Sequence, residues 1–551
     1  MNKIKNIFVC LLLCALTITG IIIDLHNQSL MAEAENSNQL NTQNLDNSIQ
    51  QNTQSTVISN HQNTQIVVNS NESNTKNLEN GSDTNTKLKY IFLFIGDGMS
   101  YPQIQLTSDY LGALKQEKDS NILSGNKHLS FMKFPVAGSA ITYDSSSFCP
   151  DSASTGTSIS TGNKTYSGTL NLDETKKTSY ETIAEKLKKQ LGYKIGIITT
   201  VNINHATPAA FYAHQDFRTN YYDIGLDLVK SNFDFFAGGA FKNEDGDSKT
   251  KKRTNLYDLA VQHGYKIIRT QDEASKLTNN SNKIILIAET LADKDSLSYA
   301  IDAKAGEWTL RDYVRTGIEV LDNETGFFLM VESGKIDWAC HANDAGSAIY
   351  EVNNLNNAVN EALDFYNKHP EETLILVTGD HETGGLSIGY TITDYETYLT
   401  NFKYQKISNE KFDSVYISKY KKNKTPFRTV LSDIKKNFGL ITSSDANAKK
   451  NPSLVLTNYE YDLLKSAYEK TLTASKLKRT QKETILYGTY EPLTVTITHI
   501  LNNKSGVNFS TFAHSGLPVG VFAKGVGETL FNGYYDNTKI FKNLKTLLEV
   551  N

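Results

Sequence analysis

The sequence predicts an α/β fold, a three-layer sandwich in which helices cover both faces of a largely parallel central sheet. Three observations predict this fold. From about Leu88 onward, short apolar runs alternate with amphipathic stretches. Several runs are unbroken and rich in Ile, Val, Leu and Phe, which is typical of strands buried on both faces. The 551 residues are 39% hydrophobic and 21% charged, a globular composition that excludes a wholly disordered or fibrous chain.

The apolar runs and the stretches between them give the expected elements. Strands are expected at 90–95, 194–201, 327–331, 374–377 and 518–523. Helices are expected at 180–191, 310–321 and 345–368. Ligands of such a sheet bind beyond the carboxyl ends of the parallel strands, so the residues that follow each run are the candidates for function.

The N-terminal part differs from the rest of the chain. We expect residues 1–34 to be a signal peptide or an N-terminal anchor, because two lysines precede an apolar run of 17 residues, and Ala-Glu-Ala at 32–34 resembles a cleavage site. In residues 35–86, 35 of the 52 residues are Asn, Gln, Ser or Thr and none is aromatic. Such a segment buries too little apolar surface to fold, so we expect a disordered stalk or leader on an exported protein, either secreted or held at the cell surface.

Carboxylates and imidazoles follow the expected strands. They come from five distant segments, and four of these segments follow a run while one precedes the last run. A single Asp-His pair after a strand is usually a turn or a cap, but five such placements at one sheet edge favour a site. The residues concerned are Asp97, His205, Glu332, Asp337, His341, Asp380, His381 and His514.

Mixed Asp and His ligation suits zinc, because imidazole and carboxylate both bind it well. Asp337 and His341 are four residues apart and converge on one ion if this turn is helical, and His514 would complete three protein ligands. Asp380 and His381 are adjacent, so one is expected to bind a second ion while the other helps to fix it. Two such ions would clamp the attacking and leaving oxygens of a phosphoryl transfer.

Ser152 lies at the start of a run of small residues that is expected to be helical. The amide groups and the dipole of a helix N-terminus favour anions, and a neighbouring zinc ion would favour the alkoxide of this serine. Ser152 is therefore a candidate nucleophile. The alternative is that Ser152 is simply an N-cap, because Asp-Ser before a helix is common.

At this point the chain resembles the alkaline phosphatases, from about Leu88 to the C-terminus. The segments that carry the resemblance occur in the family's order and with its local spacing: 94–99 (Phe-Ile-Gly-Asp-Gly-Met), 151–153 (Asp-Ser-Ala), 205–210 (His-Ala-Thr-Pro-Ala-Ala), Arg218, 332–341, 378–381 (Thr-Gly-Asp-His) and His514. The resemblance implies that 87–551 form the catalytic domain of a metal-dependent phosphomonoesterase.

The resemblance also implies roles for individual residues. Ser152 would become a phosphoserine, and Arg218 would clamp two phosphate oxygens with its planar fork. Two Zn²⁺ ions and one Mg²⁺ ion would be bound. The first zinc site would consist of Asp337, His341 and His514; the second of Asp97, Asp380, His381 and Ser152; and the magnesium site of Asp97, Thr207 and Glu332. Asp151, His205 and Trp338 would adjoin these groups.

Three positions depart from the enterobacterial pattern of the family. His205 stands where that pattern has aspartate, Trp338 where it has lysine, and Thr383 where it has a second histidine. Imidazole favours softer ions than magnesium, which puts the third metal in doubt. We predict that His205 acts through water, and that Thr383 removes one expected partner.

Residues 390–510 match no pattern and separate His381 from His514. Residues 401–480 hold 17 Lys or Arg against 7 Asp or Glu, with helical patterns at 429–437 and 458–472. This insertion is expected to be a cap over the active site, a dimer contact, a surface that attracts polyanions or phosphate esters, or a solvated lysine-rich face.

Cysteines and net charge set further limits. Cys149 and Cys340 flank site residues and would be free thiols, a disulfide or, least favoured, metal ligands. The net charge of −4 gives no basic excess, so no nucleic-acid partner is expected.

The leading hypothesis is hydrolysis of small phosphate monoesters through a phosphoserine, by an enzyme that family members suggest is a homodimer. The alternatives are a phosphodiesterase or another phosphoryl hydrolase of the same superfamily, and a non-catalytic cell-surface protein.

Overall fold

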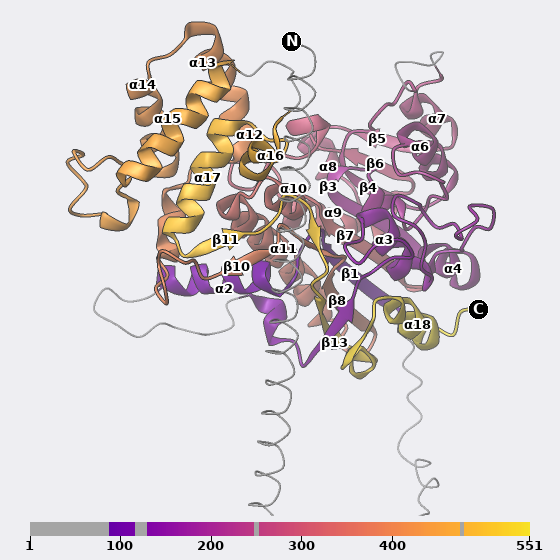
Figure 1. Cartoon of the computed structure of the whole chain (residues 1–551). Coiled ribbons are helices and arrows are strands. Elements are labelled where there is room, and N and C mark those ends of the chain that lie inside the picture. Colours follow the sequence, from indigo (N-terminus) through magenta and orange to yellow (C-terminus); the bar gives the residue numbers. More distant parts are fainter. Residues whose placement is uncertain (1–87, 116–128, 247–252, 474–478) are drawn as a thin grey trace, which may run out of the picture. The chain divides into compact units, whose positions relative to one another are not determined.

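The computed structural model describes residues 88–115, 129–246, 253–473 and 479–551 (Figure 1). The expectations for 1–34 and 35–86 therefore lie outside the described residues. Within the described ranges, no helix combines the length and apolar character that a membrane span needs.

The described residues form a ten-stranded sheet in the order β14-β2-β13-β8-β1-β7-β3-β4-β6-β5. All five expected strands are present in it. The strands are β1 (Tyr90–Gly96), β2 (Val136–Ile141), β3 (Lys194–Asn202), β4 (Phe235–Gly239), β5 (Lys266–Ile268), β6 (Ile284–Ile287), β7 (Phe327–Ser333), β8 (Thr373–Gly379), β13 (Val519–Gly525) and β14 (Tyr534–Asp536).

Only β13 runs against its neighbours in this sheet; its pairings with β2 and β8 are antiparallel, and the other pairings are parallel. Gly96 at the end of β1 pairs with Ser333 of β7 and Gly379 of β8, so these strands end level with one another. Because β13 is reversed, its beginning lies at the edge where the parallel strands end. The residues before β13 therefore join those that follow β1, β7 and β8.

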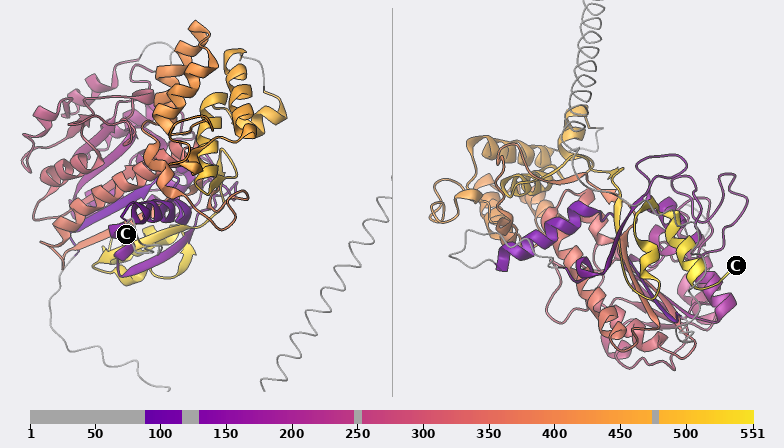
Figure 2. Two further views of the ribbon diagram at one scale, coloured as in Figure 1. Left: turned by 90° about the vertical axis from the view of Figure 1, so that its left-hand side faces the viewer. Right: turned by 90° about the horizontal axis from the view of Figure 1, so that it is seen from below.

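Successive side chains of β1 enter two different cores, which shows that the sheet is covered on both faces. Ile91, Leu93 and Ile95 belong to one core. Phe92 and Phe94 belong to the other. Figure 2 shows helices on both sides of the sheet, which confirms the predicted sandwich.

The helices divide between these two cores. The first core receives α3 (Ser152–Thr161), α4 (Ile183–Lys186), α5 (Ala206–Ala209), α6 (Tyr221–Lys230), α7 (Leu256–Gln262) and α18 (Thr538–Leu547). The second receives α2 (Tyr101–Lys115), α8 (Gln271–Ala274), α9 (Leu310–Leu321), α10 (Lys335–His341) and α11 (Ala345–Tyr366).

Two helix boundaries differ from the sequence prediction. The helix expected at 180–191 begins at Ile183, because Thr182 and Glu185 form a reciprocal capping box, and it continues as a π-helical turn over Leu187–Leu191. The helix expected to reach residue 368 ends at Tyr366.

The insertion leaves and rejoins the sandwich through a two-stranded ribbon, in which β10 (Leu386–Ile388) pairs antiparallel with β11 (Val507–Phe509). It has a hydrophobic core of its own, which packs against α2 and α11. Both expected helices are present. The insertion contains α12 (Asn409–Phe412), α13 (Ser418–Asn423), α14 (Phe427–Phe438), α15 (Asn458–Thr473), α16 (Gln481–Tyr487) and α17 (Pro492–Lys504).

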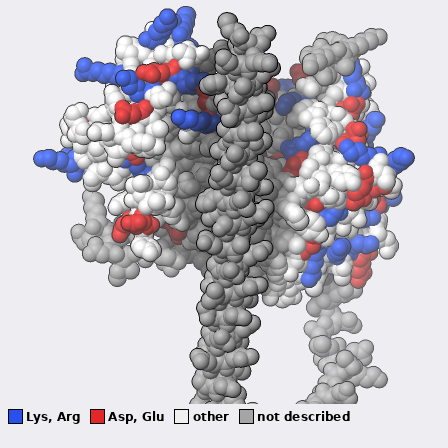
Figure 3. Space-filling view, viewed as in Figure 1, with Lys and Arg blue, Asp and Glu red and all other residues white. Residues whose placement is uncertain are grey.

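Lysines of the insertion gather on its outer end. Lys419, Lys421, Lys422 and Lys424 are exposed on or beside α13. Figure 3 shows basic side chains projecting from the surface over α13 and α14.

Candidate metal centre

A second short ribbon returns the chain from the insertion to the sheet edge. β12 (His514–Ser515) pairs antiparallel with β9 (Glu382–Thr383), and His514 lies opposite Thr383. The rings of His381 and His514 consequently stack with their centroids 3.7 Å apart.

The first ligand group consists of Asp337, His341 and His514. Both imidazole Nε2 atoms lie near Asp337 Oδ1, at 3.3 Å for His341 and 3.5 Å for His514, and they lie 3.1 Å from each other. Their Nδ1 atoms face backbone carbonyls, at 2.7 Å from Phe512 O and 2.5 Å from Pro150 O. A carbonyl only accepts, so each Nδ1 carries the proton and each Nε2 presents a lone pair. Two lone pairs and a carboxylate that converge in this way fit a cation.

Burial alone would raise the pKa of Asp337, but with no cation bound the positive charges of protonated His341 and His514 outweigh burial and hold that pKa well below its usual value. Asp337 and His341 lie one turn apart on α10, as their spacing predicted.

The second group gathers around His381. Its Nε2 lies 3.1 Å from Ser152 Oγ, 3.3 Å from Asp97 Oδ1 and 3.4 Å from Asp380 Oδ2. The side chains of the adjacent residues Asp380 and His381 thus approach each other through Oδ2 and Nε2. Asp380 is held in this orientation because its Oδ1 accepts from the amides of Gly98 and His381 at 3.1 and 2.9 Å. Burial, with neighbouring carboxylates, raises the pKa of Asp380 to about 6 and that of Asp97 well above its usual value. A bound cation would relieve this repulsion.

The third group consists of Asp97, His205 and Glu332, with Thr207 Oγ1 at 3.3 Å from Asp97 Oδ2. Thr199 donates to Glu332 Oε2. Two buried atoms here have no hydrogen-bond partner among the described residues, His205 Nδ1 and Glu332 Oε1. Burial lowers the pKa of His205 to about 3, so the ring is neutral and carries a free lone pair. Unpartnered buried acceptors beside a carboxylate fit a third cation.

The nucleophile candidate begins α3, with Asp151 as its cap. Asp151 Oδ1 accepts from the amides of Gly168 and Ser154 at 2.8 and 3.2 Å. Its Oδ2 accepts from Arg218 NH1 at 2.7 Å. Burial opposes the charge of Asp151, but Arg218 and the Gly168 amide bring its pKa down to about 2. Asp151 therefore has two roles: it caps the helix that carries Ser152, and it orients Arg218.

Some contributors were missed by sequence reasoning. Thr383 does not remove a partner: its Oγ1 donates to Asp337 Oδ1 at 2.6 Å. Thr155 Oγ1 donates to Asp380 Oδ2 at 3.3 Å. A single threonine forms no recognisable sequence motif. The one indication in the sequence was position, because Thr383 follows the Thr-Gly-Asp-His motif and Thr155 follows the Asp-Ser-Ala motif.

The two cysteines of the described chain are free. Cys149 is exposed and Cys340 is buried, and they do not form a disulfide with each other. Neither belongs to any of the ligand groups found among the described residues. Trp338 packs edge-on against His205, with ring centroids 5.9 Å apart.

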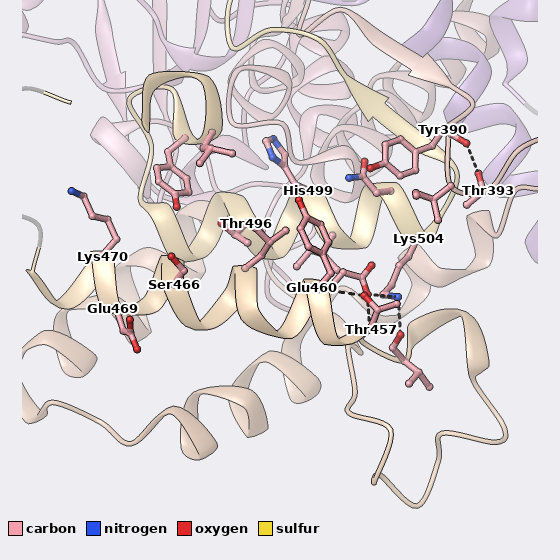
Figure 4. Close-up of a pocket in the computed structure, with 18 of the residues that line it drawn as sticks. Tyr390, Thr393, Thr457, Glu460, Ser466, Glu469, Lys470, Thr496, His499 and Lys504 are labelled. Atoms are coloured by element: carbon pink, nitrogen blue, oxygen red, sulfur yellow. Dashed lines mark hydrogen bonds and ion pairs between the residues drawn. The ribbon is translucent and has the colours of Figure 1, made fainter. Parts of the chain in front are cut away.

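Two cavities adjoin these elements. One, of about 640 Å³, reaches the metal centre and is lined by Arg218, Asp337 and His341. The other, of about 1560 Å³, lies in the insertion along α15 and α17, where Glu460 and Lys504 form an ion pair of 2.8 Å (Figure 4). His499 lines this second cavity and contacts Asn343 Oδ1 through Nε2 at 2.9 Å.

The chain is similar to known alkaline phosphatases in sequence and in fold. It is 29% identical over 473 residues to alkaline phosphatase 4 of Bacillus subtilis strain 168, covering 84% of this chain and 89% of the relative. The solved structure of a cold-active alkaline phosphatase from the psychrophile Shewanella sp. matches with a TM-score of 0.66 at 27% identity, covering 83% of this chain and 99% of that chain.

A third match shares the fold. It is a histidine-to-aspartate variant of alkaline phosphatase from the Antarctic bacterium TAB5, with Mg bound in a site called M3 (TM-score 0.54, 24% identity, 85% of this chain and 99% of that chain). The family model described as alkaline phosphatase matches residues 88–550. The chain therefore belongs to the alkaline phosphatase family, the enzymes that hydrolyse phosphate monoesters.

Proposed function

We propose that this enzyme hydrolyses phosphate monoesters through a phosphoserine formed on Ser152. The observation that carries the proposal is the position of Ser152 Oγ, 3.1 Å from His381 Nε2 and 3.4 Å from Asp97 Oδ1, at the N-terminus of α3. A hydroxyl placed among metal-ligand groups and at the positive end of a helix is suited to attack a phosphoryl group.

The three ligand groups support a two-zinc centre with a third metal. Imidazole and carboxylate donors fit zinc at Asp337, His341 and His514, and at Asp97, Asp380, His381 and Ser152. The oxygens of Asp97, Thr207 and Glu332 fit magnesium, with His205 acting through water. The Mg held by the TAB5 variant, in which aspartate replaces a histidine, agrees with the preference of magnesium for oxygen ligands.

When bound, the zinc ions supply stabilisation of the charge on the attacking and leaving oxygens. Arg218 binds two oxygens of the phosphoryl group, held in place by its ion pair with Asp151. Ser152 Oγ loses its proton and forms a bond to phosphorus as the bond from phosphorus to the alcohol oxygen breaks, and that oxygen takes up a proton and leaves as the alcohol.

Water then attacks the phosphoserine. Its oxygen loses a proton and bonds to phosphorus, the bond from phosphorus to Ser152 Oγ breaks, Ser152 Oγ takes up a proton, and inorganic phosphate leaves. Both transfers would use the same helix N-terminus and the same arginine, because both occur at the phosphorus bonded to Ser152 Oγ.

Hydrolysis of p-nitrophenyl phosphate and of its bis-ester at alkaline pH tests the proposal, before and after chelation and with zinc and magnesium restored separately. We expect a strong preference for the monoester, loss on chelation and recovery with zinc. Ser152→Ala should lower kcat by at least ~10³-fold while zinc stoichiometry is unchanged. A preference for the diester, or an active Ser152→Ala variant, would overturn the proposal.

We also propose that the enzyme is exported and forms a homodimer. The lysines and the apolar run at 7–23 support export. Cell fractionation and light scattering of the purified enzyme measure these two properties directly.

A further inference from the structure

The cavity at the metal centre is larger than a phosphoryl group requires. Its volume is about 640 Å³, whereas a water molecule occupies about 30 Å³ in the liquid and a phosphate displaces only a few waters. His205, a member of the third ligand group, also lines it, so the cavity is continuous with the metal centre. The remaining space is where the alcohol part of a monoester lies.

That remaining space is walled by a second part of the chain. The insertion contributes Asn409, Glu410, Asp413, Ser414 and Tyr490, and the loop before α9 contributes Asp293, Lys294 and Tyr299. The alcohol part of the substrate therefore meets residues that take no part in phosphoryl transfer.

Carboxylates dominate the wall formed by the insertion. Within the described part of the chain, the Glu410 carboxylate has neither a hydrogen bond nor an ion pair, and burial with the nearby Asp293 raises its pKa. Asp413 accepts from Thr494. Burial, with Glu491 and Glu410 nearby, raises the pKa of Asp413 to about 7. At alkaline pH both groups are anionic.

Two lysines lie near this wall, and the charge of Lys335 lowers the pKa of Glu410 against the effect of burial. Lys294 forms an ion pair of 3.8 Å with Asp293. Lys335 is fully buried behind the cavity wall, with its Nζ over the rings of Tyr299 and Trp338 at 4.1 and 5.1 Å, and that Nζ has no hydrogen-bond partner among the described residues.

The aromatic wall attracts cations too. The Trp338 ring already has two ammonium groups of this chain over it, Lys294 Nζ at 4.6 Å and Lys335 Nζ at 5.1 Å from its centroid, so it is not counted as a site for the ammonium group of a substrate. Tyr490 presents a further ring to the same cavity. An ammonium group within about 6 Å of such rings is attracted by their quadrupole.

Building on the proposed function, we infer that Glu410 and Asp413 form a leaving-group subsite for alcohols that carry an ammonium group. Phosphate monoesters of amino alcohols would be favoured there, because opposite charges attract strongly in a partly buried site. Monoesters whose alcohol carries a carboxylate would be disfavoured, because like charges repel.

Three substrates of matched size test this inference with the full, metal-loaded enzyme: 2-aminoethyl phosphate, 2-hydroxyethyl phosphate and phosphoglycolate. The measured quantity is the ratio of kcat/KM for the ammonium substrate to that for the carboxylate substrate, compared between variants. We expect Glu410→Gln to lower this ratio at least fivefold and Glu410→Gln with Asp413→Asn to lower it further. Glu410→Lys should invert the preference.

The control variant is Asp462→Asn, which removes an exposed carboxylate from α15 of the same insertion, and it should leave the ratio unchanged. High salt should reduce the ratio in the wild type more than in Glu410→Gln. A ratio that is equal in the wild type, Glu410→Gln and Glu410→Lys would overturn the subsite. If the zinc-loaded wild type hydrolysed none of the three substrates, the proposed function itself would fail.

Discussion

Asp151→Asn separates the two tasks of Asp151, because it keeps the shape of the side chain and removes its charge. The amide oxygen can still accept from the backbone of Gly168 and Ser154, which Oδ1 does at 2.8 and 3.2 Å, so α3 keeps its cap. The amide nitrogen then faces Arg218 NH1 at the 2.7 Å position of Oδ2, where two donors oppose each other. The charge-assisted hydrogen bond to Arg218 is lost.

A hydrogen bond to a charged group contributes about 1.5–3 kcal/mol. If Arg218 needs this bond to hold the phosphoryl group in the transition state, kcat/KM for p-nitrophenyl phosphate falls by roughly 10- to 150-fold, since each 1.4 kcal/mol is tenfold. Steady-state kinetics with saturating zinc and magnesium measure the change.

The matched control is Asp216→Asn, which removes an exposed charge two residues from Arg218 without touching its guanidinium. We expect kcat/KM within twofold of the wild type for this variant. If Asp151→Asn also stayed within twofold, or if both variants fell equally, the orientation of Arg218 by Asp151 would be refuted.

Three further predictions follow from the packing and the ligand groups. Gly156→Ala places a Cβ 2.7 Å from Ala210 Cβ, between α3 and α5, so the free energy of unfolding should fall by about 1–3 kcal/mol in chemical denaturation; unchanged stability would contradict this close packing. His205→Asp adds an oxygen ligand, so less Mg²⁺ should be needed for half-maximal activity, and an unchanged titration with Mg²⁺ would show that His205 has no influence on the third metal. Exposed Cys149 should react with a thiol reagent in the native enzyme and buried Cys340 only after unfolding; native-state labelling that survives in Cys149→Ser and maps to Cys340 would argue otherwise.

Much of the fold was predictable from local patterns. Strands β1, β3, β7 and β8 are themselves buried on both faces. An unbroken run of apolar residues is the sequence pattern typical of such strands. The helix expected at 180–191 shows the limit of this approach: periodicity located it, but the capping box at Thr182 set where it begins.

The candidate site was predictable as a set of residues but not as a geometry. Asp337 and His341 converge because they lie one turn apart on α10, which spacing alone predicts. His514 reaches them because β13 is reversed and because the two short ribbons return the chain after the insertion. Strand direction depends on pairing between distant segments, and a single sequence does not display it.

The sequence by itself determined the class of fold, the ligand types and the order of the motifs. Local apolar runs indicate which segments are buried, and the residue types and their spacing indicate which side chains can bind a metal ion. The tertiary structure alone decided which atoms meet: Arg218 with Asp151, Thr383 with Asp337, and Glu410 with the cavity at the metal centre. Arg218 and Asp151 are 67 positions apart in the chain, and Thr383 and Asp337 are 46 positions apart. Glu410 reaches the cavity because it belongs to the insertion. Only long-range packing of the sheet, its helices and the insertion specifies them.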